Sequence, residues 1–253
     1  MALHFVNISR EEFLEKKLLH KFMPLEYALD TLNHKHLWFA NPTTWKDPFE
    51  KRFITATYKR QGNVSRNFAW KDRVFCICMT QTATSEAYWN TYSHHSIGIE
   101  LKFLRTRLLE ALEEMAELYD VFIGKVEYMK TSDIKKSLPD IPFNPNCNRN
   151  IGTKECKARL LLLKRIAYRY EDEIRIMIIK KKPTKENGIY LTYACSNTDM
   201  IDSITLDPSI DKNVTKLLKD TFVNNYGFRP VLHKYRVQKS SLYIDVKPAE
   251  ISL

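Results

Sequence analysis

The chain of 253 residues contains 44% apolar and 28% charged residues and only six glycines. This composition is typical of a folded protein and excludes a disordered or linker-rich chain, while the length allows one large domain or two small ones. The formal net charge of +10 favours anionic partners, although the basic residues are spread along the chain.

Strand and helix patterns alternate along the chain without a break in composition that would mark a second domain. In chain order the sequence predicts a strand at 16–23, a helix opening at Pro24, strands at 36–42, 73–80 and 96–103, a helix at 104–118, a strand at 122–129, a helix at 153–168, strands at 171–179 and 188–194, a strand and a helix between 204 and 227, and one or two strands at 231–244. Clustered prolines and asparagines predict a loop-rich segment at about 131–152. We therefore expect a single α+β domain over residues 1–253, with a mixed, mostly antiparallel sheet flanked by helices.

The cysteines and the apolar segments bear on the cellular compartment. Five cysteines include no CxxC pair, and their odd number argues against a complete disulfide framework. Cys76 and Cys78 alternate within one strand pattern, which predicts two small core residues on the same face. The first residues lack the apolar stretch of a signal peptide, and no run is long enough to span a bilayer. These features predict a cytoplasmic protein with no membrane partner.

The segment from Tyr168 to Ile179, YRYEDEIRIMII, combines charged residues with a strand pattern. In a strand, Glu171, Glu173 and Arg175 share one face, and the isoleucines between them face a core. Two carboxylates at this spacing lie roughly 6–7 Å apart, and their repulsion raises one pKa unless a cation intervenes. Such a pair could hold a sugar hydroxyl and stabilise a developing cation. The alternative is an exposed strand end with a weak ion pair.

A second candidate site lies in WNTYSHHSIGIEL, residues 89–101. Trp89 and Tyr92 could stack against a nucleobase or a nicotinamide ring, and His94 or His95 could act as an acid, a base or a metal ligand. The alternative is ordinary aromatic packing beside a histidine pair in a turn.

A third candidate is LWFANPTTWKDPFE, residues 37–50. Its Asp-Pro pair at 47–48 suits a turn that the neighbouring aromatic side chains could bury, which favours structural anchoring. The alternative places Asp47 or Glu50 in a pocket.

Several common catalytic motifs are absent from the sequence: a Walker A loop, GxGxxG, HExxH and GxSxG. P-loop hydrolysis, a Rossmann dehydrogenase, a zincin and a serine hydrolase are therefore disfavoured. A zinc site is disfavoured too, because neither His34-x-His36 nor the His94–His95 pair is accompanied by a convincing set of further ligands. We predict no metal.

Five short segments, in this order, resemble a widespread bacterial family known as domain of unknown function twenty-nine seventy-one. The segments are HKF at 20–22, LWFANPTTWKDPFE at 37–50, FCICMT at 75–80, WNTYSHHSIGIEL at 89–101 and KRIAYRYEDEIR at 164–175. Their order and spacing match the family over most of the chain, roughly residues 18–245. Lys46 replaces the family's usual Asn, Tyr168 its Trp and Ser96 its Gly, and the family histidine corresponds to His94 or His95.

The order of elements is also similar to the layout of ADP-ribosyltransferases. In those enzymes a first-strand His or Arg holds NAD, aromatic residues sandwich the nicotinamide, and a late glutamate stabilises the oxocarbenium-like state. The resemblance implies NAD as a substrate. The residues that it implies are, for catalysis, Glu173, Glu171 and Arg175 and, for substrate binding, His20, Lys21, Trp89, Tyr92, His94, His95 and Asp47.

Three hypotheses about function follow. The first is an enzyme that acts on NAD or a related anionic nucleotide, as an ADP-ribosyltransferase or glycohydrolase with a toxin or phage-defence role. The second is a nucleic-acid-binding protein or nuclease, which the basic residues Lys180–Lys182, Lys234, Arg236 and Lys239 would serve. The third is a non-catalytic sensor or adaptor that acts through a partner protein.

Overall fold

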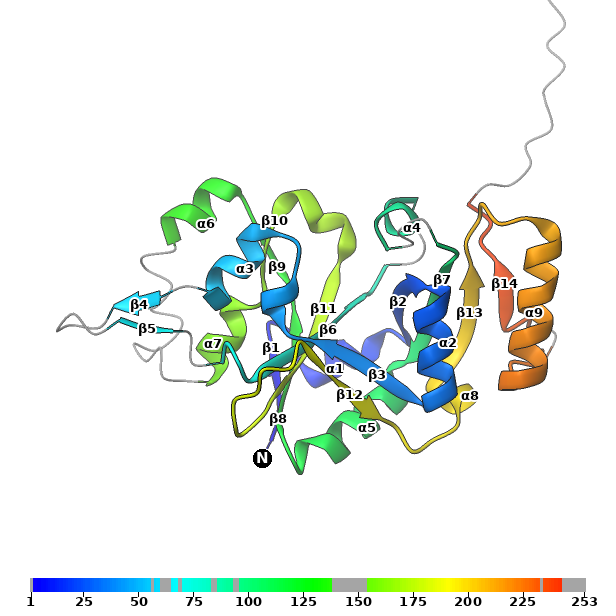
Figure 1. The fold of residues 1–253 in the computed structure, drawn as a ribbon, viewed down its shortest axis with the longest axis horizontal. Coiled ribbons are helices and arrows are strands. Elements are labelled where there is room, and N and C mark those ends of the chain that lie inside the picture. The colour runs from blue at the N-terminus through cyan, green and yellow to red at the C-terminus, as the bar shows by residue number, and fades with distance from the viewer. Residues whose placement is uncertain are drawn as a thin grey trace, which may run out of the picture.

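A ten-stranded mixed sheet runs through the protein (Figure 1). The computed structural model describes residues 2–55, 57–59, 65–67, 70–82, 86–92, 96–137, 154–232 and 234–242. In spatial order the strands of the main path are β1 (Leu3–Val6), β8 (Asp120–Lys125), β11 (Glu173–Ile179), β6 (Val74–Thr80), β2 (Leu18–Pro24), β7 (Gly98–Leu104), β13 (Ile201–Leu206) and β14 (Val237–Lys239). Strand β3 (His36–Ala40) branches from β6 and pairs with β12 (Gly188–Thr192).

Most neighbouring strands in this sheet are antiparallel, and β1–β8 and β13–β14 are parallel. Two small sheets accompany it: β9 (Glu127–Met129) with β10 (Leu163–Arg165), and β4 (Thr57–Lys59) with β5 (Ser65–Asn67). A single α+β domain with a mixed, mostly antiparallel sheet is therefore confirmed.

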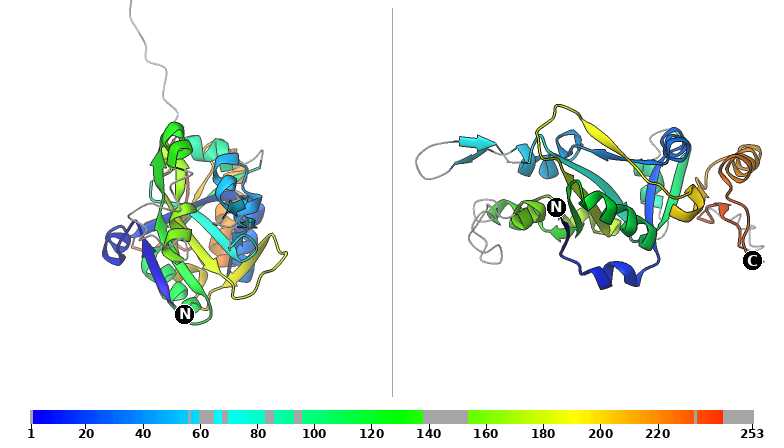
Figure 2. Two further views of the ribbon diagram at one scale, coloured as in Figure 1. Left: turned by 90° about the vertical axis from the view of Figure 1, so that its left-hand side faces the viewer. Right: turned by 90° about the horizontal axis from the view of Figure 1, so that it is seen from below.

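Helices cover both faces of the sheet and its ends. They are α1 (Arg10–Glu15), α2 (Leu25–His34), η1 (Pro42–Thr44), α3 (Pro48–Thr55), α4 (Glu86–Tyr92), α5 (Arg105–Ala116), α6 (Thr131–Ser137), α7 (Lys154–Leu160), η4 (Ile166–Glu171), α8 (Asn197–Met200) and α9 (Lys212–Tyr226). Figure 2 shows the β4–β5 ribbon at one end of the long axis and α9 at the other. Among the described helices, none combines the length with the apolar composition that crossing a bilayer requires.

The alternation of side chains along β11 divides the interior into two cores. Ile174, Ile176 and Ile178 join the larger core, which α2, α5 and α9 cover. Met177 and Ile179 face the opposite way, into a smaller core that α3 and α7 cover. Both faces of β11 are buried along its whole length, so charged side chains at its start are held inside the protein.

Strands β2 and β6 diverge, and this split positions the candidate site. Within these two fully described strands, His20 opposite Thr80 is the single register pair. By contrast, β2 pairs with β7 along seven residues. The Nζ of Lys21 donates to the carbonyl oxygen of Cys78 at 2.9 Å. This contact gives a partner to a backbone acceptor where the ladder of the two strands is open.

The predicted helix at 153–168 is wrong beyond its first half. Helix α7 ends at Leu160, and the chain continues as β10 and the 3₁₀ helix η4. Tertiary contacts override the local helical pattern here, since Leu161 and Leu162 fill the smaller core and β10 pairs with β9. Glu171 therefore belongs to η4, and β11 begins at Glu173, so the prediction that both glutamates lie on one strand is also wrong.

Other boundaries differ from the predictions by short segments. Residues 131–137 form α6 instead of a loop, and the rest of the predicted loop lies outside the described residues. Helix α9 begins at Lys212, because the carboxylate of Asp211 caps it, and it ends at Gly227 in the left-handed conformation, as predicted. The sequence analysis did not predict β1, α1, α3 or the helical form of α4.

Candidate functional site

A cavity opens in the split between β2 and β6. It is lined by His20, Lys21 and Phe22 of β2, Cys78, Met79 and Thr80 of β6, Tyr88 and Tyr92 of α4, and Glu171 and Glu173 of η4 and β11. Its volume of ≈ 20 Å³ suits about one water molecule. Segments that are far apart in the sequence therefore meet around one small space.

One lysine and one arginine side chain neutralise most of the negative charge of a buried acidic cluster at this cavity. The Nζ of Lys164 donates to Glu171 Oε2 at 2.6 Å and to Glu173 Oε2 at 3.0 Å, and it lies 3.4 Å from Glu50 Oε1. Arg175 donates to Glu173 through Nε at 2.8 Å, and it also pairs with Glu50. We call these five residues the charge network. It contains three carboxylates and two cations, so one negative charge is in excess when all five are ionised.

Arg175 is fully committed within the charge network. It is 1% exposed, and its Nη1 donates to the carbonyl oxygen of Leu161 at 2.6 Å. Its guanidinium group also lies over the ring of Trp45, 4.3 Å from the centroid. Arg175 therefore positions Glu173 and Glu50 and does not line the cavity.

Glu171 and Glu173 are 4% and 3% exposed, yet their pKa values move in opposite directions. Burial raises the pKa of Glu173, but the charges of Arg175 and Lys164 outweigh it and hold this pKa below the ordinary value. Burial also raises the pKa of Glu171, and there the attraction of Lys164 does not compensate for it and for the repulsion of Glu173. Glu171 is therefore the carboxyl group of the pair that can hold a proton.

The opposite wall of the cavity carries basic groups. Burial lowers the pKa of Lys21, although the nearby acidic groups oppose this effect. Nδ1 of His20 lies 2.7 Å from Oε1 of the fully buried Glu100. Burial raises the pKa of Glu100, but the hydrogen bond with His20 and the charge of Lys102 bring it below the ordinary value. A carboxylate partner of this kind fixes the orientation of the imidazole ring.

Helix α4 supplies the aromatic wall. The Tyr88 ring stacks on Phe22 at 4.7 Å between centroids, and burial raises the pKa of Tyr88 to about 12. The hydroxyl of Tyr92 donates to Glu171 Oε2 at 3.4 Å. Trp89 packs edge-on against Phe22 at 5.0 Å and does not line the cavity. Its role is packing of α4, whereas the sequence placed it against a substrate ring.

The predicted site residues thus divide into three groups. His20, Lys21, Tyr92, Glu171 and Glu173 line the cavity. Asp47 does not line it: its carboxylate accepts from Arg165 at 3.0 Å and from the backbone nitrogen of Phe49 at 2.8 Å, which anchors the start of α3. Both His94 and His95 lie outside the described residues.

Sequence reasoning missed Lys164, the residue that joins all three carboxylates of the charge network. The available signal was the position of this lysine, directly after a run of four leucines at 160–163. A charged residue that follows such an apolar run can lie at the edge of a core. Tyr88 was also missed; its hydroxyl lies 2.8 Å from Thr80 Oγ1 and donates to the carbonyl oxygen of Tyr170 at 2.9 Å.

The two cysteines of β6 are reduced, and they share one face, as predicted. The four described cysteines are free thiols. Cys76 lies in the smaller core, and Cys78 lines the cavity. Burial raises the pKa of the Cys78 thiol well above its ordinary value, so this thiol is a poor nucleophile.

Basic residues of the nucleic-acid hypothesis have structural partners. Arg236 donates to the carbonyl oxygens of Thr198 and Asp202, at 2.8 and 2.6 Å. Lys239 donates to the carbonyl oxygen of Ile210 at 2.9 Å. These contacts attach β14 and the residue before it to segments 198–202 and 210 of the same chain.

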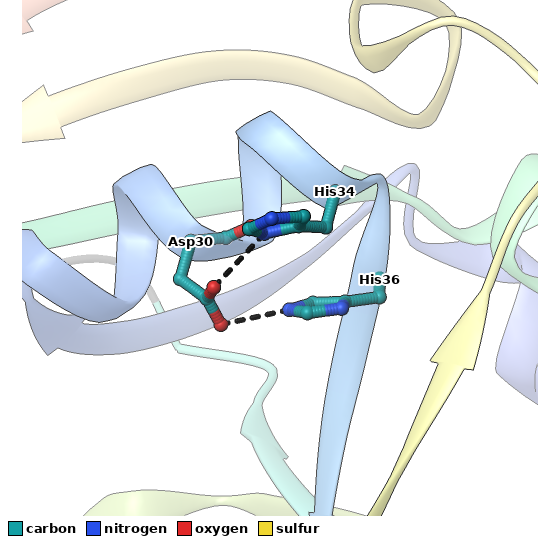
Figure 3. Close-up of side chains that lie close together, drawn as sticks. All are labelled: Asp30, His34 and His36. Atoms are coloured by element: carbon teal, nitrogen blue, oxygen red, sulfur yellow. Dashed lines mark hydrogen bonds and ion pairs between the residues drawn. The ribbon is translucent and has the colours of Figure 1, made fainter.

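A second group of polar side chains lies where α2 meets β3. Oδ2 of Asp30 lies 2.7 Å from Nε2 of His36, and Oδ1 lies 3.0 Å from Nδ1 of His34 (Figure 3). We call these three residues the Asp–His cluster. In the described part of the chain, it is the group of three histidine, cysteine or acidic side chains whose potential ligand atoms all lie within 4.8 Å of one another.

No protein-family model, curated protein or solved structure matches the chain. The resemblance to the bacterial family of unknown function and to the ADP-ribosyltransferase layout stays a prediction from the sequence.

Proposed function

We propose that the protein cleaves the bond between nicotinamide and ribose in NAD, or the corresponding bond of a related nucleotide, at the cavity between β2 and β6. The observation that supports this proposal is the convergence of His20, Lys21, Tyr92, Glu171 and Glu173 around one space. Such an activity would deplete a cellular nucleotide, which would suit a toxin or phage-defence role.

In this reaction the carbon–nitrogen bond at C1′ of the ribose breaks, and its electron pair leaves with nicotinamide. Positive charge then develops on the ribose, and the carboxylates of Glu171 and Glu173 stabilise it electrostatically. Water attacks C1′ and gives its proton to Glu171. The products are ADP-ribose, nicotinamide and this one proton, which Glu171 then releases to solvent. Glu171, whose pKa is raised, is our candidate for the acid–base role.

The basic wall suits the anionic part of the substrate. Lys21 offers an ammonium group for a phosphate or a ribose hydroxyl, and His20 is held in place by Glu100. Tyr92 lines the cavity with its hydroxyl 3.4 Å from Oε2 of Glu171, so its ring can contact the leaving nicotinamide.

The volume of the cavity adds a conformational requirement. A space of ≈ 20 Å³ does not admit a nicotinamide ring, so α4 has to move outward before the substrate binds. The buried apolar cluster at α4 consists of only Phe22, Tyr88 and Trp89 among the described residues. A helix whose buried apolar packing is this limited opens at lower free energy than the main cores do.

The proposal is tested by incubating the purified protein with NAD and measuring nicotinamide release by chromatography. We expect release above the spontaneous rate, and we expect Glu171→Gln to lower it by about 10²–10⁴-fold, the usual contribution of an acid–base group. Glu110→Gln is the matched control, because Glu110 is an exposed glutamate on α5 that pairs with Arg107.

Two outcomes would contradict the proposal. One is no release of nicotinamide by the wild-type protein when NAD and related dinucleotides are supplied. The other is equal release by the wild type and by Glu171→Gln, provided that circular dichroism shows both proteins to be folded at the assay temperature.

A further inference from the structure

The corner between α2 and β3 brings two histidines together from a short sequence. His34 is the last residue of α2 and His36 is the first residue of β3. Lys35 between them adopts the left-handed conformation, with φ 48° and ψ 51°. This conformation is unfavourable for a residue with a side chain, so the surrounding structure holds it in place.

The turn leaves the two imidazole rings stacked, with their centroids 5.1 Å apart and their planes at 24°. Asp30 precedes His34 by four residues, so its side chain lies on the same face of α2, one turn earlier. Figure 3 shows the carboxylate of Asp30 directed at both rings. Three potential ligands therefore come from one continuous segment of seven residues, 30–36.

The distances within the Asp–His cluster suit a metal ion. One nitrogen of each histidine and one oxygen of Asp30 all lie within 4.8 Å of one another. A tetrahedral zinc site with bonds of about 2.0–2.1 Å places its ligand atoms about 3.3 Å apart. Small side-chain rotations would therefore convert the observed hydrogen bonds into metal bonds.

One ligand is firmly held and another is accessible. His36 is buried, and its ring stacks on Tyr190 of β12 at 4.1 Å between centroids. His34 is exposed, and Nδ1 also lies 3.1 Å from the backbone oxygen of Asp30. A metal ion could thus enter from solvent and keep water at its remaining coordination positions, as in metal sites with two histidines and one carboxylate.

We propose that the Asp–His cluster binds one divalent transition-metal ion of the zinc type. From the sequence, His34-x-His36 lacked further ligands for a metal ion; in the structure, Asp30 supplies a third ligand. None of the three residues lines the cavity between β2 and β6, so the proposal does not depend on the nucleotide-cleavage proposal.

The test is a calorimetric titration of the full chain with zinc chloride. We expect one equivalent of zinc per chain in the wild type, and at least about tenfold weaker binding in Asp30→Asn and in His34→Gln. Asp220→Asn, at an exposed position on α9, is the matched control and should bind zinc like the wild type. In Asp30→Asn the amide oxygen can accept a hydrogen bond from one imidazole and the amide nitrogen can donate one to the other, so this variant is expected to keep the fold.

Two further measurements separate this site from accidental binding. Zinc should raise the melting temperature of the wild type, and the rise should be absent in Asp30→Asn and His34→Gln. Cobalt(II), bound in place of zinc, should show no thiolate charge-transfer band, because nitrogen and oxygen atoms form the site. No zinc binding, or equal binding by the wild type and both variants, would overturn the proposal and leave the cluster as a hydrogen-bonded corner.

Discussion

The charge network and the Asp–His cluster contain the same kind of contact in two different environments. Lys164 joins three carboxylates inside the protein, whereas Asp30 joins two histidines at a partly exposed corner. Removing one partner of a buried ion pair is destabilising, because water cannot solvate the charge that remains. The partly exposed groups can exchange partners with water or a metal ion. Burial therefore sets how strongly each group depends on its present partners.

The comparison also holds within the charge network. Glu173 contacts both Lys164 and Arg175, and its pKa is lowered. Of these two cations Glu171 contacts only Lys164, and its pKa is raised. Glu173 stabilises the fold in its ionised form. Glu171 faces the cavity with the excess charge, which makes it suited to chemistry.

The largest effect should come from breaking the network at its centre. Arg175→Met would leave Glu173 and Glu50 buried without this partner, and we expect it to lower the free energy of unfolding by about 3–5 kcal/mol in urea titrations. Arg107→Met, which removes an exposed partner of Glu110, should leave the urea midpoint unchanged. A small loss in Arg175→Met would mean that water enters the network.

A smaller loss should follow when the split between β2 and β6 is disturbed. Lys21→Met leaves the carbonyl oxygen of Cys78 without its donor, and we expect a loss of about 1–3 kcal/mol in the free energy of unfolding. Lys216→Met, at an exposed position of α9, is the control. If both variants unfold at the same urea concentration as the wild type, water replaces the ammonium group in the split.

The third effect depends on pH and separates the two glutamates. The folded-state pKa of Glu171 is raised, so the stability associated with it is fully present below about pH 4.5 and is lost as pH rises through the raised value. Glu171→Gln should therefore gain stability relative to the wild type as pH rises from about 4.5 through the raised pKa of Glu171. Urea titrations across this range measure the gain.

Glu173→Gln should show the opposite sign, because the folded-state pKa of Glu173 is lowered. Its contribution is present above about pH 4.5 and is lost only as pH falls through the lowered value. The two variants should thus diverge in stability at neutral pH. Parallel curves for both variants would contradict the opposite pKa shifts.

The smallest effect is expected at the corner of α2 and β3. Without metal, Asp30→Asn should change the free energy of unfolding by less than about 1 kcal/mol, because exposed ion pairs contribute little. A loss comparable to that of Arg175→Met would show that Asp30 holds the corner as a buried charge would, and the contrast between the two regions would fail.

Much of the fold could be predicted because the signals are local. The alternation of Ile174, Ile176 and Ile178 predicted β11 with its two faces, and Gly227 predicted the end of α9. The helical pattern of 153–168 failed since the leucines at 161–162 serve a core that forms only when α7, β8 and β11 come together. A periodic pattern shows which residues are apolar, but not which partner buries them.

The candidate site shows the same limit. The sequence determined that Glu171, Glu173 and Arg175 stand close together, and that His34 and His36 lie two residues apart. Only the tertiary structure decided that Lys164 neutralises the glutamates and that Trp89 packs against Phe22 without lining the cavity. Spacing along the chain fixes local direction, whereas burial and long-range charge contacts depend on which segments meet in space, and these set the pKa values and the accessibility on which any chemistry depends.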